Sequence, residues 1–172
     1  VIRRLKQCGI SKVVMMTGDS DRIASTIAHK VGVDEYYSEV LPEDKAKFVE
    51  NEKKSGRRVI MIGDGINDSP ALSEASVGIA ISDGAEIARE IADVTISADD
   101  LYEIATLKRL SDAMVRRINK NYHMIVGINT GLILLGVAGV FRPTMSALLH
   151  NTSTILISLK SMENLLDAGT KL

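Results

Sequence analysis

Residues 1–98 alternate short apolar runs with amphipathic stretches. Short apolar runs favour buried strands, and amphipathic stretches between them favour helices that cover a parallel sheet. The runs predict strands at Val13–Thr17, Tyr36–Val40, Val59–Ile62, Val77–Ile81 and Val94–Ile96. The intervening stretches predict helices at Asp21–Val31, Glu43–Ser55, Asp68–Glu74 and Ala85–Ile91. This order is typical of a doubly wound α/β domain, whose active site lies at the carboxyl ends of the strands.

The rest of the chain has a different pattern. Apolar residues at helical spacing predict a long helix at Asp99–Asn119. Residues 121–159 then contain Arg142 as their only Lys, Arg, Asp or Glu. The uncharged run 121–141 is about 31 Å long as a helix, which matches the hydrocarbon thickness of a bilayer. Because a second apolar stretch follows Pro143, we expect two membrane-spanning helices, at about 121–141 and 144–166.

The basic residues Arg116, Arg117 and Lys120 before the first apolar run predict that this end lies in the cytosol. The expected organisation is therefore an α/β domain at 1–98, a cytosolic linking helix at 99–120 and a membrane hairpin at 121–172. The linking helix runs directly into the hairpin, so we expect it to transmit domain motion to the hairpin. The alternative is a hairpin buried in a large water-soluble core.

Composition adds few restrictions. A net charge of −1 gives no support for nucleic-acid binding. Cys8 is the only cysteine, which excludes an internal disulfide and a cysteine-based zinc cluster. The chain begins at Val1 without a signal peptide, inside what reads as the end of a helix, so we expect it to be a fragment.

The most informative motif is Gly-Asp-Gly-Ile-Asn-Asp-Ser-Pro-Ala-Leu at residues 63–72, directly after a predicted strand. Glycines let the backbone turn tightly, and a carboxylate at a strand end suits a hard cation such as Mg²⁺. Asp64 is placed to bind the metal, and Asn67 and Asp68 to orient ligands or water. In the alternative interpretation this is an ordinary turn in which Asp68 only caps the next helix.

Two further loops carry candidate chemistry. Thr17-Gly18-Asp19-Ser20 follows a predicted strand and opens a helix, so its hydroxyl and backbone N–H groups suit a phosphate. The alternative is a plain helix cap by Asp19 or Ser20. Lys45 lies in the first turn of a predicted helix, against the helix dipole, and therefore favours an anionic partner such as a phosphoryl group. Alone, such a lysine is usually exposed to solvent.

Together, the ordered Thr, Lys and Asp loops resemble the haloacid-dehalogenase-type phosphorylation domain of P-type ATPases, and the resemblance extends over essentially the whole chain. It implies that the chain is part of an ATP-driven metal pump that uses Mg²⁺, an enzyme that hydrolyses ATP and translocates metal ions. It also implies an integral membrane protein of a prokaryotic plasma membrane, with residues 1–120 cytosolic. The implied partners are the nucleotide-binding and actuator domains, the other membrane helices and the lipid bilayer.

The resemblance assigns roles to single residues. It implies that Thr17 holds the phosphoryl oxygens, with Gly18 beside it in the catalytic loop, that Asp19 lies toward the nucleotide and that Lys45 stabilises the phosphoryl group. In the motif at residues 63–72 it implies that Asp64 and Asp68 bind Mg²⁺ and that Asn67 supports this site. It also implies that Gly63 and Gly65 lie at the cofactor-binding turn.

One part of the family pattern is missing. The nucleophile of the family is the Asp of an Asp-Lys-Thr-Gly-Thr motif, and the sequence contains no such string. Aspartyl-phosphate chemistry requires that carboxylate. We therefore predict that this chain alone neither hydrolyses ATP nor transports ions.

Two apolar spans after the phosphorylation domain resemble the heavy-metal subclass of the family. In such spans polar side chains are costly unless they are used, and here Asn129, His150 and Asn151 are the candidates for binding the transported ion. An imidazole with amide oxygens suits a divalent ion such as Zn²⁺, Cd²⁺, Co²⁺ or Mn²⁺. Copper pumps resemble the chain less, because Ile128 and Leu148 stand where they carry Tyr and Met.

Four alternatives remain open from the sequence. The polar side chains of the hairpin can simply hydrogen bond between helices. The pump can be of the copper type. The chain can be a membrane-anchored phosphatase, although that needs an Asp-x-Asp pair that is missing before Val13. Finally, it can be a non-catalytic membrane module that binds a metal or a partner pump.

Overall fold

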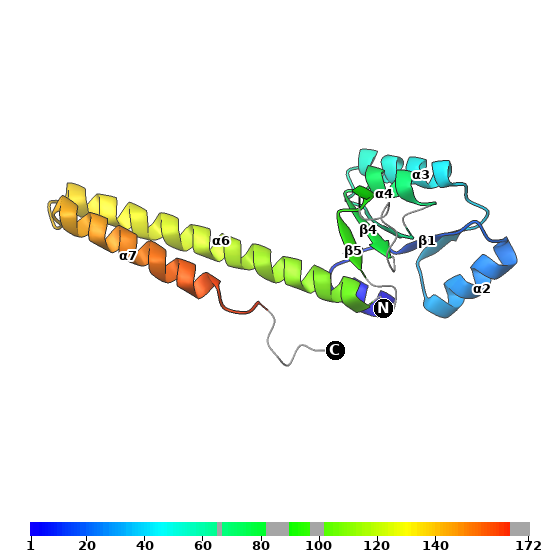
Figure 1. Ribbon diagram of the computed structural model, residues 1–172, viewed down its shortest axis with the longest axis horizontal. Coiled ribbons are helices and arrows are strands. Elements are labelled where there is room, and N and C mark those ends of the chain that lie inside the picture. The colour runs from blue at the N-terminus through cyan, green and yellow to red at the C-terminus, as the bar shows by residue number, and fades with distance from the viewer. Residues whose placement is uncertain (65–66, 82–89, 97–101, 166–172) are drawn as a thin grey trace. The chain divides into compact units, whose positions relative to one another are not determined.

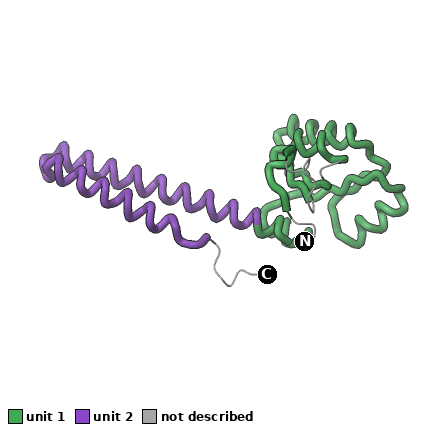
Figure 2. Tube along the Cα trace, viewed as in Figure 1, with its two compact units in different colours: residues 1–106 green, residues 107–172 purple. Residues whose placement is uncertain are grey.

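The computed structural model describes residues 1–64, 67–81, 90–96 and 102–165. The chain divides into two compact units, Val1–Thr106 and Leu107–Leu172, shown in green and purple in Figure 2. Each unit is described by itself below.

The first unit is an α/β structure in which helices connect parallel strands (Figure 1). β1 pairs with β2, and β3, β4 and β5 form a second sheet in which β4 is central; every pair is parallel. The elements in order are α1 (Ile2–Gln7), β1 (Val14–Met16), α2 (Asp21–Val31), β2 (Glu35–Tyr37), α3 (Pro42–Lys54), β3 (Ile60–Gly63), α4 (Ser69–Glu74), β4 (Val77–Ile81), β5 (Val94–Ile96) and the start of α6 (Tyr102–Val137).

Most predicted elements are confirmed with small shifts at their ends. The prediction for the second strand is wrong at its end, because β2 stops at Tyr37 rather than at Val40. The reason is local: Glu39 has a left-handed backbone (φ 54°) that no extended strand allows, and its N–H donates to the carbonyl of Asp19. The predicted helix at Ala85–Ile91 lies largely outside the described residues, as do residues 99–101 of the predicted linking helix.

The single doubly wound sheet expected from the sequence is present as two sheets. Within the described residues, β1–β2 and β3–β4–β5 share no backbone pairing. They nevertheless share a core, because Met16 of β1 packs against the apolar cluster of Val49, Met61, Ala71 and Leu72. This cluster joins α3 and α4 to β3, and the two helices lie side by side in Figure 1.

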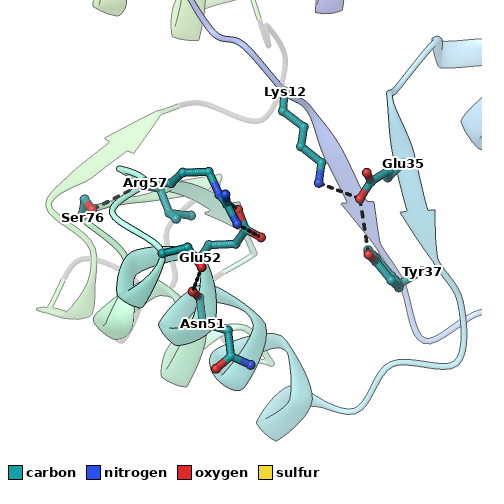
Figure 3. A network of polar contacts seen from close by, with 9 residues as sticks. Lys12, Glu35, Tyr37, Asn51, Glu52, Arg57 and Ser76 are labelled. Carbon is teal, nitrogen blue, oxygen red and sulfur yellow. Dashed lines mark hydrogen bonds and ion pairs between the residues drawn. The ribbon is translucent and has the colours of Figure 1, made fainter.

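Ion pairs tie the ends of these elements together (Figure 3). Arg57 binds the carboxylate of Glu52 with two nitrogens, which fixes the chain between α3 and β3. This contact lowers the pKa of Glu52 and raises that of Arg57. Across β1 and β2, Lys12 lies 2.7 Å from Glu35, and the hydrogen bond raises the pKa of Lys12.

The second unit is a helical hairpin. The C-terminal part of α6 lies beside α7 (Pro143–Ser161), and the contacts of Asn129 with His150 and of Asn121 with Ser161 show that the two helices are antiparallel. Gly139, with φ 74°, supplies the left-handed residue that the tight connection needs. Pro143 occupies the first turn of α7, where its missing N–H has no intrahelical partner to lose.

Many apolar side chains of this hairpin are exposed; Ile133, Leu134, Val137, Leu148 and Leu156 are each more than 60% exposed. Within the described residues, however, no helix reaches the combination of length and mean hydropathy required to cross a bilayer. The predicted membrane spans at 121–141 and 144–166 are therefore not confirmed.

Candidate functional site

The loop after β1 is joined to the start of α3 by backbone hydrogen bonds. Val40 donates to the carbonyl of Thr17 (3.0 Å), and Glu39 donates to the carbonyl of Asp19 (2.9 Å). Because Val40 lies two residues before α3, these bonds hold the Thr17 loop next to the helix that carries Lys45.

Within that loop, Thr17 and Asp19 bind each other. The Thr17 hydroxyl donates to Oδ2 of Asp19 (2.9 Å) and accepts from the backbone N–H of Asp19 (3.2 Å). Ser20 occupies the cap position of α2 but makes no side-chain cap bond. The plain-cap interpretation by Ser20 is therefore not observed, and the hydroxyl and carboxylate form a small polar group at the carboxyl end of β1.

Lys45 and Asp68 form the best-defined contact of the site. Nζ of Lys45 lies 2.7 Å from Oδ1 of Asp68, and each side chain is only 13% exposed. Asp68 stands at the cap position of α4, yet its side chain makes no cap bond. The interpretations of Lys45 as an exposed residue and of Asp68 as a plain helix cap are thus wrong for this structure.

Gly63 is needed for this arrangement because Asp68 lies directly against it. A Cβ atom at position 63 would stand 2.4 Å from Oδ2 and 2.6 Å from Cβ of Asp68. Such distances do not occur between real side chains, so any larger residue at position 63 must displace Asp68.

Asp64 follows the last residue of β3 and lies at the surface. Its Oδ1 accepts a hydrogen bond from the backbone N–H of Asn67 (3.3 Å), and this bond closes the turn toward α4. Gly65, also predicted for this site, lies outside the described residues.

The residues at this turn fit a magnesium ion. Mg²⁺ typically binds one or two carboxylates together with water and substrate phosphates, so a carboxylate at a strand end is a suitable ligand. Asp64 supplies one carboxylate, whose Oδ1 accepts from Asn67, and Asp68 supplies another, one oxygen of which is held by Lys45. In the part of the chain that the structure describes, no group of three His, Cys, Asp or Glu side chains forms a ready metal cage.

A chain of contacts therefore links all three motifs found in the sequence. The Thr17 loop is bonded to the segment before α3, Lys45 of α3 binds Asp68, and Asn67 next to it binds Asp64. The chemistry available at this end of the sheets is one ammonium group, carboxylate oxygens and a hydroxyl. These groups suit a phosphoryl group and its counter-ion.

The sequence did not reveal a second tie between the same two helices. Lys53, near the end of α3, donates to both the carbonyl oxygen and the carboxylate of Glu74 at the end of α4. α3 and α4 are thus bonded at both ends, by Lys45–Asp68 and by Lys53–Glu74. The only signal was a basic residue in the last turn of a helix, which is too common to identify a partner.

In the hairpin, two of the three predicted ion-binding residues meet. Nδ1 of His150 lies 2.7 Å from Oδ1 of Asn129. Both line a groove of about 650 Å³ between α6 and α7, together with the third predicted residue, Asn151. Its other lining residues are mostly apolar, with Ser146 as a further polar one.

Comparisons with known proteins find similar hydrolases and metal-transporting ATPases. The haloacid dehalogenase-like hydrolases match residues 1–76. A zinc-exporting P-type ATPase of Mycobacterium marinum is 39% identical over 158 residues, which cover 91% of this chain and 22% of that protein. A copper-transporting ATPase of Rhizobium meliloti is 45% identical over 148 residues, covering 86% of this chain and 18% of that protein.

Solved structures of metal-transporting ATPases are also similar to this chain. The crystal structure of a zinc-transporting PIB-type ATPase superposes with a TM-score of 0.83 at 30% identity, covering 94% of this chain and 26% of the other. The chain thus spans about a fifth of the length of the curated relatives it matches. The first unit has the parallel-sheet fold of the haloacid dehalogenase-like hydrolases, and the relatives are ATP hydrolases.

Proposed function

With the heavy-metal P-type ATPase family supported by sequence relatives and solved structures alike, we propose that this chain is one segment of such a pump. In this proposal the first unit is the rear part of the phosphorylation domain, and the hairpin is part of the ion pathway. The nucleotide-binding domain, the actuator domain and the other membrane helices belong to the rest of the pump.

The Lys45–Asp68 pair carries the phosphorylation part of the proposal. Asp68, held against Gly63, orients the ammonium group of Lys45 toward the carboxyl end of β3. There the ammonium stabilises the negative charge of a phosphoryl group during transfer. The Thr17 hydroxyl binds a phosphoryl oxygen, and Asp19 holds that hydroxyl in place. Asp64 binds Mg²⁺, which neutralises charge on the phosphate oxygens when bound.

The nucleophilic carboxylate must come from another part of the pump. β1 pairs only with β2, and β3 only with β4, within the described residues, although Met16 of β1 and Met61 of β3 reach one apolar cluster. We propose that a further parallel strand, ending in the nucleophilic Asp, pairs with β1 and β3. That strand places its Asp between the Thr17 and Asp64 loops.

Phosphorylation of the complete pump by inorganic phosphate tests this assignment. Lys45→Met removes the ammonium group and leaves Asp68 with an unpaired charge, so phosphoenzyme formation falls by about 100-fold or more. Lys47→Met is the matched control, because Lys47 lies on the same helix with a 67% exposed side chain and pairs with Asp44 of that helix. Equal phosphorylation of the two variants would contradict the proposal.

His150 carries the ion-pathway part of the proposal. Because Oδ1 of Asn129 accepts hydrogen bonds only, the bond between the two residues requires a proton on Nδ1 of His150. The lone pair then lies on Nε2, which is the atom we assign to the transported ion. Asn129 in this view orients the ligand rather than binding the ion, and Asn151 in the groove is a candidate further ligand.

An imidazole nitrogen beside amide and hydroxyl oxygens favours a divalent ion, Zn²⁺, Cd²⁺, Co²⁺ or Mn²⁺, over Cu⁺, which prefers sulfur. ATPase activity of the complete pump across these ions decides the matter. We expect stimulation by a divalent ion, and a loss of that stimulation in His150→Ala. Stimulation by Cu⁺ alone, unaffected by His150→Ala, would favour a copper-type pump instead.

The membrane location of the hairpin is also part of the proposal. It is supported by the large exposed apolar side chains of α6 and α7, which are costly in water. A polar side chain such as Asn129 needs a partner in that location, and His150 of α7 supplies one. Alkaline carbonate extraction of membranes that express this chain tests the location. Release of the chain into the supernatant would refute it.

A further inference from the structure

The base of the hairpin contains a set of polar contacts that neither the phosphate chemistry nor the ion site uses. Nη1 of Arg117, on α6, donates to the carbonyl oxygens of Ser161 (3.0 Å) and Glu163. Nη2 of the same residue donates to the carbonyl oxygen of Asn164 (3.1 Å). One side chain thus binds three carbonyl groups at and just beyond the end of α7.

One helical turn along α6, a second residue joins these contacts. The side-chain amide of Asn121 donates to the hydroxyl of Ser161 (2.6 Å), and that hydroxyl donates to the carbonyl of Ile157 (2.8 Å). Arg117 and Asn121 are half-buried, whereas Arg116, next to Arg117, is exposed. We refer to Arg117, Asn121 and Ser161 as the basal clamp.

The physical role of the clamp follows from the chemistry of helix ends. The last carbonyl groups of a helix have no partner within it and carry a partial negative charge. A guanidinium group offers several N–H donors in a fixed plane and a full positive charge, so Arg117 binds the Ser161 carbonyl at the helix end together with two carbonyls just beyond it. α7 is therefore capped by a residue of its neighbouring helix.

This cap also fixes how the helices are aligned. Between the clamp and the Asn129···His150 contact, about 12 Å along α6, the half-buried residues of α6 include Ile125 and Ile128, and Ile157 of α7 is buried. Apolar contacts have little directionality and tolerate sliding or rotation of one helix on another. Directional bonds at the base remove that freedom.

We propose that Arg117 is a positioning residue of the ion pathway. By holding the end of α7 on α6, with the help of Asn121, it sets the height and rotation of α7 at which His150 meets Asn129. Arg117 acts through α7 and does not touch the ion. This inference rests on the proposed role of His150 in ion binding.

The first test measures the metal dependence of ATP hydrolysis by the complete pump. In Arg117→Ala, the metal concentration for half-maximal activity rises by about tenfold, as it does when an orienting partner of a metal ligand is lost. The rate at saturating metal changes less. Arg117→Lys, which keeps donors and charge, recovers part of the affinity. Arg116→Ala removes the same charge at the adjacent exposed position and leaves the metal dependence unchanged.

The second test measures the clamp itself. Spin labels on Tyr122→Cys and Leu159→Cys, which are 62% and 58% exposed, report the distance between the helices at the base. In the complete pump that distance distribution broadens in Arg117→Ala and keeps its width in Arg116→Ala. If Arg117→Ala does not accumulate in membranes, Arg117→Lys takes its place, with a smaller broadening.

The outcomes separate the two proposals. Wild-type metal dependence and distances in the Arg117 variants would overturn the positioning role. If His150→Ala leaves the metal dependence unchanged, the ion-binding proposal fails and the positioning role falls with it, even where the distances respond to Arg117.

Discussion

Gly63 and Asp68 illustrate how closely the side chains of the site are packed. Asp68 occupies the space in which position 63 would carry a Cβ atom, and from there it holds Lys45. The ion pair between Lys45 and Asp68 therefore requires glycine at position 63. Glycine there is also a condition for the orientation of the ammonium group.

We predict that Gly63→Ala destabilises the first unit by about 1–3 kcal/mol, because the added methyl group must displace Asp68. Gly18→Ala is the control, since its Cβ meets only the carbonyl of Val40 at 4.0 Å. The free energies of unfolding of the two variants, measured in urea, give the comparison. An equal stability of both variants would argue against the close packing.

At the level of residues, the sequence predicted the types of group at the site better than their partners. Lys45 was expected to need an anion because of its place in the first turn of a helix. That the anion is Asp68 depends on how α3 and α4 pack over β3, which no local pattern contains. The role of Arg117 was missed for the same reason, because its acceptors are backbone carbonyls 44 to 47 residues away.

At the level of elements, the connection between β1 and β2 has a titratable component. Asp34, just before β2, accepts from the backbone N–H of Val13 and from Lys6. The hydrogen bond from Lys6 is the main cause that holds the pKa of Asp34 below its usual value, and the bond from Val13 is the next.

The stability of this connection therefore depends on pH. Because the pKa of Asp34 is lower in the folded state, its contribution is present above the unfolded pKa of about 3.8 and is lost as the pH falls through the folded pKa. We predict that Asp34→Asn reduces the loss of stability below about pH 4. Urea unfolding of both proteins between pH 3 and 6 measures the difference, and parallel curves would refute the role of Asp34.

The packing of α3 and α4 depends on fully buried side chains, of which Leu72 is one. Leu72 of α4 is 1% exposed and belongs to the apolar cluster that joins both helices to β3. We predict that Leu72→Ala destabilises the first unit by about 3 kcal/mol through the cavity it leaves. Leu41→Ala, at a 64% exposed position, has little effect on the same unfolding curve. Similar losses in both variants would contradict this view of the core.

The elements themselves were largely predictable, because hydrophobic periodicity and Pro or Gly at helix ends are local signals. The exception at Glu39 arises from a left-handed backbone that is stabilised by a bond to Asp19, a contact distant in sequence. The division into two sheets was also not predictable. Strand pairing depends on every strand present, and apolar runs do not specify neighbours.

At the level of the whole molecule, the proposal makes this chain dependent on the rest of a pump. We predict that the isolated chain shows no Mg²⁺-dependent ATP hydrolysis, because its sequence lacks the Asp-Lys-Thr-Gly-Thr nucleophile motif. A malachite-green assay of released phosphate checks this. Adding a separately expressed front part of the phosphorylation domain should restore phosphorylation, and robust turnover by the chain alone would overturn the prediction.

Within the described residues, β1 and β3 are each paired along one edge, and this has a consequence for handling the protein. An unpaired strand edge offers a row of N–H and C=O groups to any other extended segment. The unpaired edges of two copies of the chain can pair with each other, and further copies can add in the same way, which leads to aggregates. Expressed alone, the chain should therefore form inclusion bodies more readily than a version co-expressed with the segment that, in our proposal, supplies a strand between β1 and β3.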